Sequence, residues 1–467
     1  MQNSAVSAYK IFIRLCIIRK FYVNLHFSLI TYYYMNVLII NGSPKGAGSI
    51  TLQTCLYIQK HFPEHHYEVL HVGQKIAQFE RDFGEAAEAL RRADLLLFAY
   101  PVYTFLAPSQ LHRFVELMKE HISVGVLNIE GKCATQITTS KHFYDVTAHR
   151  YIEDNGKDMG LRLFPGLSAD MDDLLSEKGR GEALSFFQYV LFQIGGMPET
   201  DSISEKTIAV VADLAPEDGS LKTMVDTFIS YLKCKYKLIN INDFPFKGGC
   251  ISCFNCSGDG KCIYSDGFDT FLREEIQTCD AIVYAFTIKD HSMGSRFKMY
   301  DDRQFCNGHR TVTMGAPTGY LINGDYAHEP NLQMVVEGRA NVGGNYLCGV
   351  ATSEEVCDAE HRIMGIKELA SCLGYALAHK YQQPANFFGV GGMKIFRDLI
   401  YQMRGLMRAD HKFFKSHGQY DFPQKKWGTS MKMYLVGWLM NNKKLRRRVG
   451  GEMTTGMLKP YREAMKK

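Results

Sequence analysis

A glycine-rich segment near the start of the chain has the composition of an anion-binding loop. Residues 41–51 read NGSPKGAGSIT and follow the apolar run 36–40. The glycines let the backbone approach an anion closely, the hydroxyl groups donate hydrogen bonds, and Lys45 supplies a counter-charge. Such a loop between a parallel strand and a helix also adds the partial positive charge of the helix N-terminus. The segment predicts a phosphate site, with a plain glycine-rich turn as the alternative.

A second segment carries four cysteines in the spacing C-x2-C-x2-C-x5-C, namely Cys250, Cys253, Cys256 and Cys262. Structural zinc sites usually separate two C-x2-C pairs by a long loop. Three closely spaced cysteines with a nearby fourth better suit an iron–sulfur cluster held by one tight loop. Ile263 stands where a bacterial ferredoxin motif has proline, so the segment is not an ordinary ferredoxin. Zinc, or a cysteine loop without metal, is the alternative.

Other nucleotide-binding motifs do not fit the sequence. No Gly-Lys-Ser/Thr follows the loop at residues 41–51, which excludes a Walker motif there. The loop also lacks the G-x-G-x-x-G pattern of dinucleotide-binding proteins. Residues 389–392 read GVGG, but no strand pattern precedes them. Neither of these two motifs therefore describes the loop at residues 41–51.

Bulk composition limits the classes of function. The chain has 467 residues, 46% of them hydrophobic, and a net charge of only +5, which calls for no nucleic-acid partner. Its 13 cysteines are an odd number and most lie singly in apolar segments. That usage fits a reducing compartment and predicts a cytoplasmic protein. Residues 11–34 are apolar and aromatic but interrupted by charges, which argues against stable membrane insertion. We expect residues 1–34 to be an N-terminal extension before Met35, with a signal peptide as the alternative.

The pattern around the first motif alternates strands and helices. Predicted strands are 36–40, 66–72, 93–100 and 133–139; predicted helices are 50–60, 108–119 and 182–194. Residues 140–180 read as a polar, glycine-containing insertion. Alternation with short connections predicts an α/β fold with a doubly wound parallel sheet, over a first domain at 35–203.

The alternation of predicted strands and helices then begins again after residue 204. Predicted strands are 207–212, 236–241, 281–286, 311–314 and 346–350; predicted helices are 221–232 and 360–379. We expect a second domain of the same fold at 204–383. Residues 384–467 predict a helical C-terminal appendage. Its basic run, residues 443–448, favours a solvated helix face over contact with anionic lipid.

The first half resembles the flavodoxin-like NAD(P)H-dependent FMN reductases. Residues 41–51 resemble the FMN phosphate loop of that family, residues 100–103 its second flavin loop, and residues 140–144 occupy the place of its third loop. The resemblance assigns to FMN the residues Ser43, Lys45, Gly48, Ser49, Ile50, Thr51, Pro101, Val102, Tyr103, Thr104, Ser140 and His142. Packing in the core is the alternative role for Tyr103 and for Phe105.

The second half resembles the iron–sulfur flavoproteins, through the cysteine motif and the segments 267–280, 291–295 and 298–303. That resemblance implies FMN, a [4Fe–4S] cluster on Cys250, Cys253, Cys256 and Cys262, and a homodimer or larger assembly. The match is incomplete in both halves. The first half has no cysteines near 72–78, and the acidic segment 213–220 would repel a phosphate in the second. We therefore expect one FMN in the first half and one cluster in the second.

Together these features predict an FMN-dependent oxidoreductase that passes electrons between FMN and a [4Fe–4S] cluster, linked to NAD(P)H or ferredoxin. Its partners would be a small-molecule or redox-protein electron donor and acceptor. The first alternative is an NAD(P)H-dependent FMN or quinone reductase without a cluster. The second is a non-catalytic electron carrier or metal-binding module. The sequence indicates no catalytic acid or base.

Overall fold

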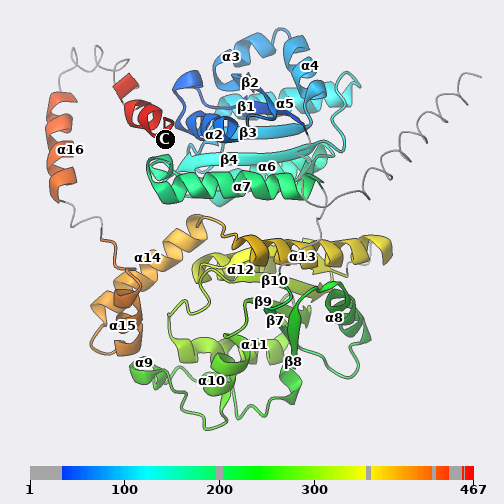
Figure 1. The fold of residues 1–467 in the computed structure, drawn as a ribbon, viewed down its shortest axis with the longest axis vertical. Coiled ribbons are helices and arrows are strands. Elements are labelled where there is room, and N and C mark those ends of the chain that lie inside the picture. Colours follow the sequence, from blue (N-terminus) through cyan, green and yellow to red (C-terminus); the bar gives the residue numbers. More distant parts are fainter. Residues whose placement is uncertain are drawn as a thin grey trace, which may run out of the picture.

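The computed structural model describes residues 34–195, 203–353, 359–422, 427–440, 455–456 and 458–466. Two α/β units follow one another along the chain, and the C-terminal helices run beside both (Figure 1). The expected extension before Met35 and the basic run 443–448 lie outside the described residues, apart from Tyr34.

The first unit contains a parallel sheet in the order β2-β1-β3-β4-β5, with β6 also pairing with β4. Its strands are β1 (Asn36–Asn41), β2 (His66–Leu70), β3 (Leu95–Pro101), β4 (Cys133–Ser140), β5 (Arg162–Leu163) and β6 (Leu167–Asp170). The apolar runs of β1 and β3 are buried along almost their whole length, as central strands with helices on both faces must be. This strand order is that of flavodoxin-like sheets.

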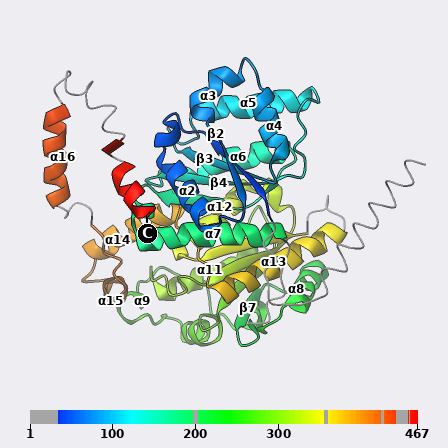
Figure 2. The same cartoon turned by 45° about the horizontal axis from the view of Figure 1, so that its top comes forward.

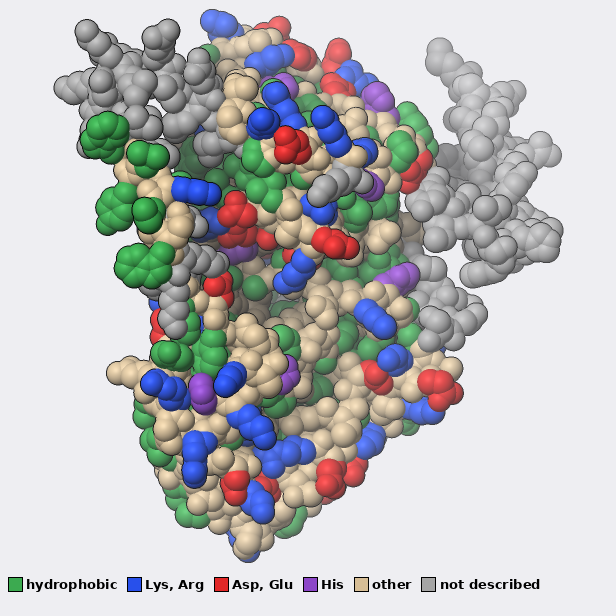
Figure 3. Space-filling view, turned by 60° about the vertical axis from the view of Figure 1, so that its left-hand side comes forward, with side chains coloured by type: hydrophobic (Ala, Val, Ile, Leu, Met, Phe, Trp, Pro, Cys, Tyr) green, Lys and Arg blue, Asp and Glu red, His purple; other side chains and the backbone are tan. Residues whose placement is uncertain are grey.

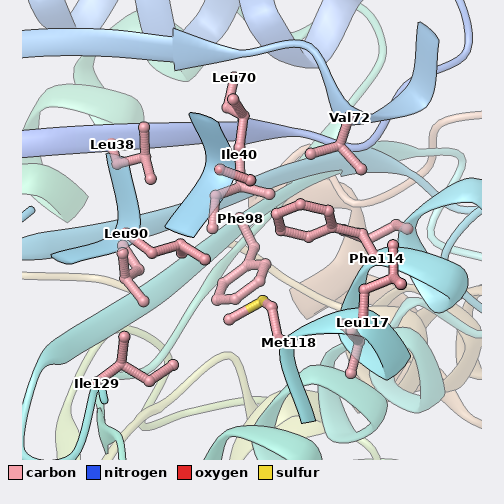
Figure 4. Packing of buried hydrophobic residues seen from close by; sticks show 14 of the residues in the cluster. Leu38, Ile40, Leu70, Val72, Leu90, Phe98, Phe114, Leu117, Met118 and Ile129 are labelled. Atoms are coloured by element: carbon pink, nitrogen blue, oxygen red, sulfur yellow. The ribbon is translucent and has the colours of Figure 1, made fainter. Parts of the chain in front are cut away.

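Helices cover both faces of this sheet. They are α2 (Ile50–His61), α3 (Val72–Phe79), α4 (Gly84–Arg92), α5 (Ser109–Ser123), α6 (Asp145–Asp158) and α7 (Glu177–Gly195). One core joins β1 and β3 to α3, α4, α5 and α6, with Phe98 packed near Phe114 and Met118 (Figure 4). The other core joins the opposite face to α2 and α7.

The second unit has the same strand order. Its strands are β7 (Thr207–Ala212), β8 (Lys235–Asn240), β9 (Ala281–Thr287), β10 (Pro317–Asn323) and β11 (Tyr346–Thr352), arranged β11-β10-β9-β7-β8 with every pair parallel. Helices α8 (Gly219–Tyr231) and α13 (Ala359–His379) pack on one face. The other face carries α10 (Phe268–Phe271), α11 (Gly294–Arg303) and α12 (Pro330–Gly343). The prediction of two doubly wound α/β sheets is confirmed.

Two local predictions are wrong. Residues 140–180 are not an insertion, because they contain α6 and the short strands β5 and β6 that extend the first sheet. The strand expected at 311–314 is a turn, and the sheet is built instead from β10. β10 was missed because Gly319 interrupts its apolar run. A Cβ at Gly319 would lie 2.7 Å from Leu369 on α13, so the helix packs directly on the backbone there.

The two units contact each other through α7 and α13, which lie between the sheets (Figure 1). Tyr189 of α7 stacks on Tyr381 with ring centroids 4.6 Å apart and also contacts Tyr346 and Tyr375. Gln193 Nε2 donates a hydrogen bond to Cys372 Sγ at 3.8 Å. Residues from α7 are thereby part of the core of the second unit.

The C-terminal helices connect both units. They are α14 (Phe387–Gln402), α15 (Arg408–Ser416) and α16 (Trp427–Met440), and they agree with the helical appendage expected from the sequence. Farther along, Tyr461 returns to the first unit, where it packs with Tyr57 and Leu174 and donates a hydrogen bond to Met171 O at 2.8 Å. Across the described part of the chain, no helix is both long and apolar enough to span a membrane.

Replacing Tyr189 with alanine should uncouple the two units. The side chain is almost fully buried among three rings of the second unit, so its loss should lower the free energy of unfolding by about 3–5 kcal/mol. Urea denaturation followed by circular dichroism would measure this change. Tyr231→Ala at the exposed end of α8 is the matched control, and it should change stability by less than about 0.5 kcal/mol. Equal effects of both variants would contradict this role of Tyr189.

Candidate functional site

A cavity of about 360 Å³ opens at the carboxyl ends of β1, β3 and β4. This is the edge at which open α/β sheets bind ligands. Every residue that the sequence assigned to FMN lines the cavity, except Gly48 and His142. The wall also contains Phe105, Thr139, Lys141, Phe143 and Met171, which were not among the assigned residues.

The first loop folds around its own hydrogen bonds and presents the start of α2 to the cavity. Asn41 Nδ2 donates to Gly46 O at 2.9 Å, and the Ser43 N–H donates to Asn41 Oδ1 at 3.2 Å. Ser49 caps α2 by accepting the Leu52 N–H at 3.3 Å. The first N–H groups of a helix have no partner within it, so those of Ile50 and Thr51 can serve a ligand.

The three glycines of this loop differ in conformation and surroundings. Of Gly42, Gly46 and Gly48, only Gly46 has a positive φ, at +51°. Gly42 is required for space instead, because a Cβ there would lie 2.8 Å from Leu111 Cδ2. Gly48 donates its N–H to Lys45 O at 2.9 Å and lies outside the cavity wall. The loop is therefore compact, and Lys45 is left exposed at its tip.

The second loop is a tight turn in an uncommon backbone conformation. Tyr103 and Leu106 exchange backbone hydrogen bonds of 2.8 and 3.1 Å, and the two residues between them, Thr104 and Phe105, have φ of +47° and +73°. Left-handed conformations are unfavourable for non-glycine residues, above all for β-branched threonine, and they gather at functional sites. The Tyr103 and Phe105 side chains are exposed and line the cavity, so neither packs in the core.

The third loop is fixed from behind by a buried carboxylate. Asp145 accepts hydrogen bonds from His142 Nδ1 at 3.0 Å and from the Phe387 N–H of α14 at 2.9 Å. Tyr144 stacks on the Phe387 ring with centroids 4.5 Å apart. The structure thus places His142 behind the loop rather than in the cavity wall, because its imidazole is turned toward Asp145. Phe387 lies 242 residues from Asp145 in sequence, so no local pattern could have revealed this contact.

Lys141 of this loop is held at the cavity by two carboxylates. Its ammonium lies 2.6 Å from Asp170 Oδ1 and 2.9 Å from Asp172 Oδ2. Burial lowers the pKa of Lys141, but these two ion pairs outweigh it, and the net pKa is raised. Met171, between the two aspartates, lines the cavity. The sequence D-M-D was the available signal, but it fell within the expected insertion.

The corresponding position in the second unit is filled by a side chain. Asp218 caps α8 by accepting the Leu221 N–H at 3.0 Å, and its carboxylate also accepts from Thr287 Oγ1 and, at 3.3 Å, from Asn323 Nδ2. A carboxylate therefore sits where the first unit offers the start of its helix to a ligand. An anionic ligand at this position would meet the negative charge of Asp218.

The four-cysteine loop connects β8 to β9. Cys250 and Cys253 are exposed, whereas Cys256 and Cys262 are half-buried, and all four are free thiols. Burial raises the pKa of Cys256, and the charges of the three other cysteines raise it further. Within the described residues, however, no group of three or more His, Cys, Asp or Glu converges on a metal position. The cluster expected from the sequence stays a prediction.

A buried ion pair holds both ends of the cysteine loop. Arg303 of α11 binds Asp266 through two hydrogen bonds of 2.7 and 2.8 Å, and it donates a third, of 2.9 Å, to Gly248 O. The guanidinium also faces the rings of Tyr264 and Phe268, at 4.6 and 5.0 Å from their centroids. The hydrogen bonds from Arg303 lower the pKa of Asp266 to about 2. Arg303 thus ties together residues 248 and 264–268 on either side of the cysteines.

This ion pair should make the second unit sensitive to acid. The folded-state pKa of Asp266 lies below its ordinary value of 3.8, so the stabilisation is complete above about pH 4 and is lost as the pH falls toward 2. The expected loss is about 1–2 kcal/mol, allowing for solvent screening. Urea unfolding of the native chain and of Asp266→Asn at pH 5 and pH 2.5 would measure it, and the variant should lose less stability between them. An equal loss would show that other carboxylates cause the acid sensitivity.

Comparisons with known proteins support the fold of the first unit. The model of a family described as having a flavodoxin-like fold matches residues 35–157. No curated protein matches the chain. Solved structures similar to part of it include an NADPH-quinone reductase from P. pentosaceus, with 16% identity, coverage of 33% of this chain and 95% of that chain, and a TM-score of 0.27.

Two further structures are similar over a comparable share. One is an FMN-dependent NADH-azoreductase from Bacillus anthracis in complex with FMN, with 15% identity, coverage of 34% and 98%, and a TM-score of 0.26. The other is a flavoenzyme NAD(P)H:(acceptor) oxidoreductase from Paracoccus denitrificans, with 15% identity, coverage of 34% and 97%, and a TM-score of 0.29. At these identities the similarity concerns fold alone. By its strand order and the family match, the first unit has the flavodoxin-like fold.

Proposed function

We propose that the first unit binds one FMN in its cavity and that the protein is an FMN-dependent oxidoreductase. The observation that carries this proposal is the cavity itself, which three loops of a flavodoxin-like unit form at the ends of β1, β3 and β4. Its volume of about 360 Å³ falls in the range of small-molecule sites, roughly 300–1,000 Å³.

The cavity residues fit the two chemical parts of FMN. The Ser43 and Ser49 hydroxyls, the exposed ammonium of Lys45 and the N-terminus of α2 suit a phosphate dianion. The turn at 103–106 and the Phe143 ring offer backbone and apolar surface to a planar ring system. The residues that line the cavity include two lysines and no carboxylate, so nothing in the wall repels an anionic ligand.

FMN, when bound, would supply hydride and single-electron chemistry. The protein would bind the phosphate, orient the ring with the turn at 103–106 and keep Lys141 charged beside the site. Its donor would be NAD(P)H or a ferredoxin, and its acceptor a small molecule or a redox protein. The rings of Tyr103, Phe105 and Phe143 are exposed at the cavity and would offer a second planar molecule a surface on which to stack. This exposed surface favours an enzyme over a sealed electron carrier.

We further infer that Cys250, Cys253, Cys256 and Cys262 hold a [4Fe–4S] cluster. Four cysteine thiolates are the ligand set of such clusters, and the spacing places all four on one loop. The hydrogen bonds by which Arg303 holds both ends of this loop support the inference. The same four thiols could hold zinc, so the chemistry of the ligand set alone leaves both metals open.

Binding of FMN should depend on Lys45 and Ser49. Removing a hydrogen bond to a charged group costs about 1.5–3 kcal/mol, so Lys45→Ala and Ser49→Ala should each raise the FMN dissociation constant by roughly 10–150-fold. Quenching of flavin fluorescence on titration into the flavin-free protein would give the affinity. Ser220→Ala, at the start of α8, is the matched control in the second unit and should leave the affinity unchanged.

The same titration should saturate near one FMN per chain. Saturation near two FMN molecules per chain would contradict the view that the Asp218 carboxylate occupies the corresponding position in the second unit. If Lys45→Ala and Ser49→Ala both left the FMN affinity unchanged, the cavity of the first unit would be excluded as the FMN site. Oxidation of NAD(P)H by the FMN-loaded protein, with an artificial acceptor, then separates an enzyme from an electron carrier.

The cysteine loop should confer a broad visible absorbance on protein purified without oxygen and reconstituted with iron and sulfide. Cys256→Ser should lose this absorbance and most of the bound iron. Cys279→Ser, which changes a half-buried cysteine outside the motif, should retain both. A colourless protein with one zinc per chain would contradict the cluster. A protein without metal would favour a flavin reductase in which these cysteines bind nothing.

A further inference from the structure

A second cavity, of about 400 Å³, lies at the opposite edge of the first sheet from the FMN cavity, where the strands begin. The end of α2, the loop that follows it and the start of β2 form its walls. Residues 458–466 lie beside α2 (Figures 1 and 2), where Lys60 Nζ donates a hydrogen bond of 2.7 Å to Met465 O, and Met465 lines the cavity. The volume is in the range of small-molecule sites, roughly 300–1,000 Å³.

Two polar side chains in the wall of this second cavity have no hydrogen-bond partner. The His65 residue is only 5% accessible, and neither of its ring nitrogens is hydrogen-bonded within the described part of the chain. Glu64 Oε1 lies 3.8 Å from His65 Nε2, which is beyond hydrogen-bond distance. The hydroxyl of Tyr67 is also buried without a described partner. Buried polar atoms in folded proteins are almost always hydrogen-bonded, so this pair indicates a bound molecule.

The polar groups of the wall are mainly hydrogen-bond donors. Burial lowers the pKa of His65, which keeps its imidazole neutral, with one donor nitrogen and one acceptor nitrogen. Burial also raises the pKa of Tyr67, so its hydroxyl keeps its proton and can donate it. The Gln59 amide and the Lys60 ammonium supply further N–H groups. A ligand rich in acceptors therefore fits this wall.

The remaining lining residues narrow the class of ligand. The residues that line the second cavity include a lysine and no carboxylate, which favours an anion and disfavours a cation. An inorganic anion would gain nothing from the apolar part of the wall, which consists of Leu56, Pro63 and Met465. A purely apolar molecule would leave His65 and Tyr67 buried without partners, which is costly.

We propose that the second cavity binds a small organic acid. Its carboxylate would accept hydrogen bonds from Lys60, His65 and Tyr67, and its apolar body would cover the apolar residues of the wall. The site serves for binding, and no bond of the ligand forms or breaks there. The proposal is independent of what binds in the FMN cavity, because the two cavities share no lining residue.

An aromatic acid and its neutral amide test the chemistry of the ligand. Isothermal titration calorimetry of the full-length protein should show one site per chain for 2-naphthoate. The amide has nearly the same shape without the charge, so 2-naphthamide should bind at least about 10-fold more weakly. Excess FMN should leave the affinity for 2-naphthoate unchanged. Absence of 2-naphthoate binding, equal binding of acid and amide, or displacement of the acid by FMN would each overturn the proposal.

A pair of lysine variants tells the two cavities apart. Lys60→Met keeps the length of the side chain but removes its charge, so it should weaken 2-naphthoate binding about 10-fold, and Lys60→Arg should restore most of the affinity. Lys45→Ala changes the FMN cavity alone and should bind 2-naphthoate as the native chain does. If Lys45→Ala loses the acid and Lys60→Met retains it, the acid occupies the FMN cavity and the proposal is wrong.

Tyr67→Phe separates a ligand contact from a structural role. The variant removes a hydroxyl that has no described partner, so the midpoint of thermal unfolding without ligand should not fall, whereas 2-naphthoate should bind at least about 10-fold more weakly. Tyr236→Phe is the matched control, because Tyr236 occupies the corresponding position of β8 and is 49% exposed, and it should change neither quantity. A lower midpoint with unchanged affinity in Tyr67→Phe would show that water alone serves the hydroxyl, and it would overturn the proposal.

Discussion

The buried carboxylate of Asp145 links the cavity of the first unit to the far end of the chain. It receives one hydrogen bond from His142 within the third cavity loop and another from the backbone of Phe387 at the start of α14. A buried carboxylate without donors is costly, so loop and helix must form together. The left-handed conformations of His142 and Tyr144 persist because this contact holds them. The third loop of the cavity therefore depends on a segment that follows the second unit in the sequence.

The two units have the same fold but differ at the position where the first unit has its cavity. Their sheets have the same strand order, and the strand at the third position along the chain is followed in each by the same tight turn. Thr104 and Phe105 have positive φ in the first turn, and Asp290 and His291 have positive φ in the second. The divergence lies in the loop before the first long helix. In the first unit, the glycines and serines of this loop leave the start of the helix open to an anion. In the second unit, the carboxylate of Asp218 occupies the corresponding position.

The sequence predicted the features that depend on residues close together in the chain and missed those that depend on contacts between distant segments. Strands such as β1 and β9 were predictable because their apolar runs are continuous, whereas Gly319 hid β10. The cavity loops were predictable because ligands bind where parallel strands end. The orientation of His142 and the approach of Met171 and Phe387 were not, because they depend on contacts between distant segments. The domain limits at 35–203, 204–383 and 384–467 stay a prediction.

The C-terminal helices differ in how they are held, and this difference separates their roles. Asp145 fixes the start of α14. Asp410 of α15 is buried against the second unit, where it accepts hydrogen bonds from Arg310 Nη1 at 3.1 Å and from the His309 N–H at 3.2 Å. Gly308 is required there, since a Cβ would lie 2.4 Å from Asp410 Oδ1. Two buried carboxylates thus make α14 and α15 part of the folded body. The apolar side chains of α16 that the structure describes are exposed instead (Figure 3), so neither of these buried carboxylates holds that helix.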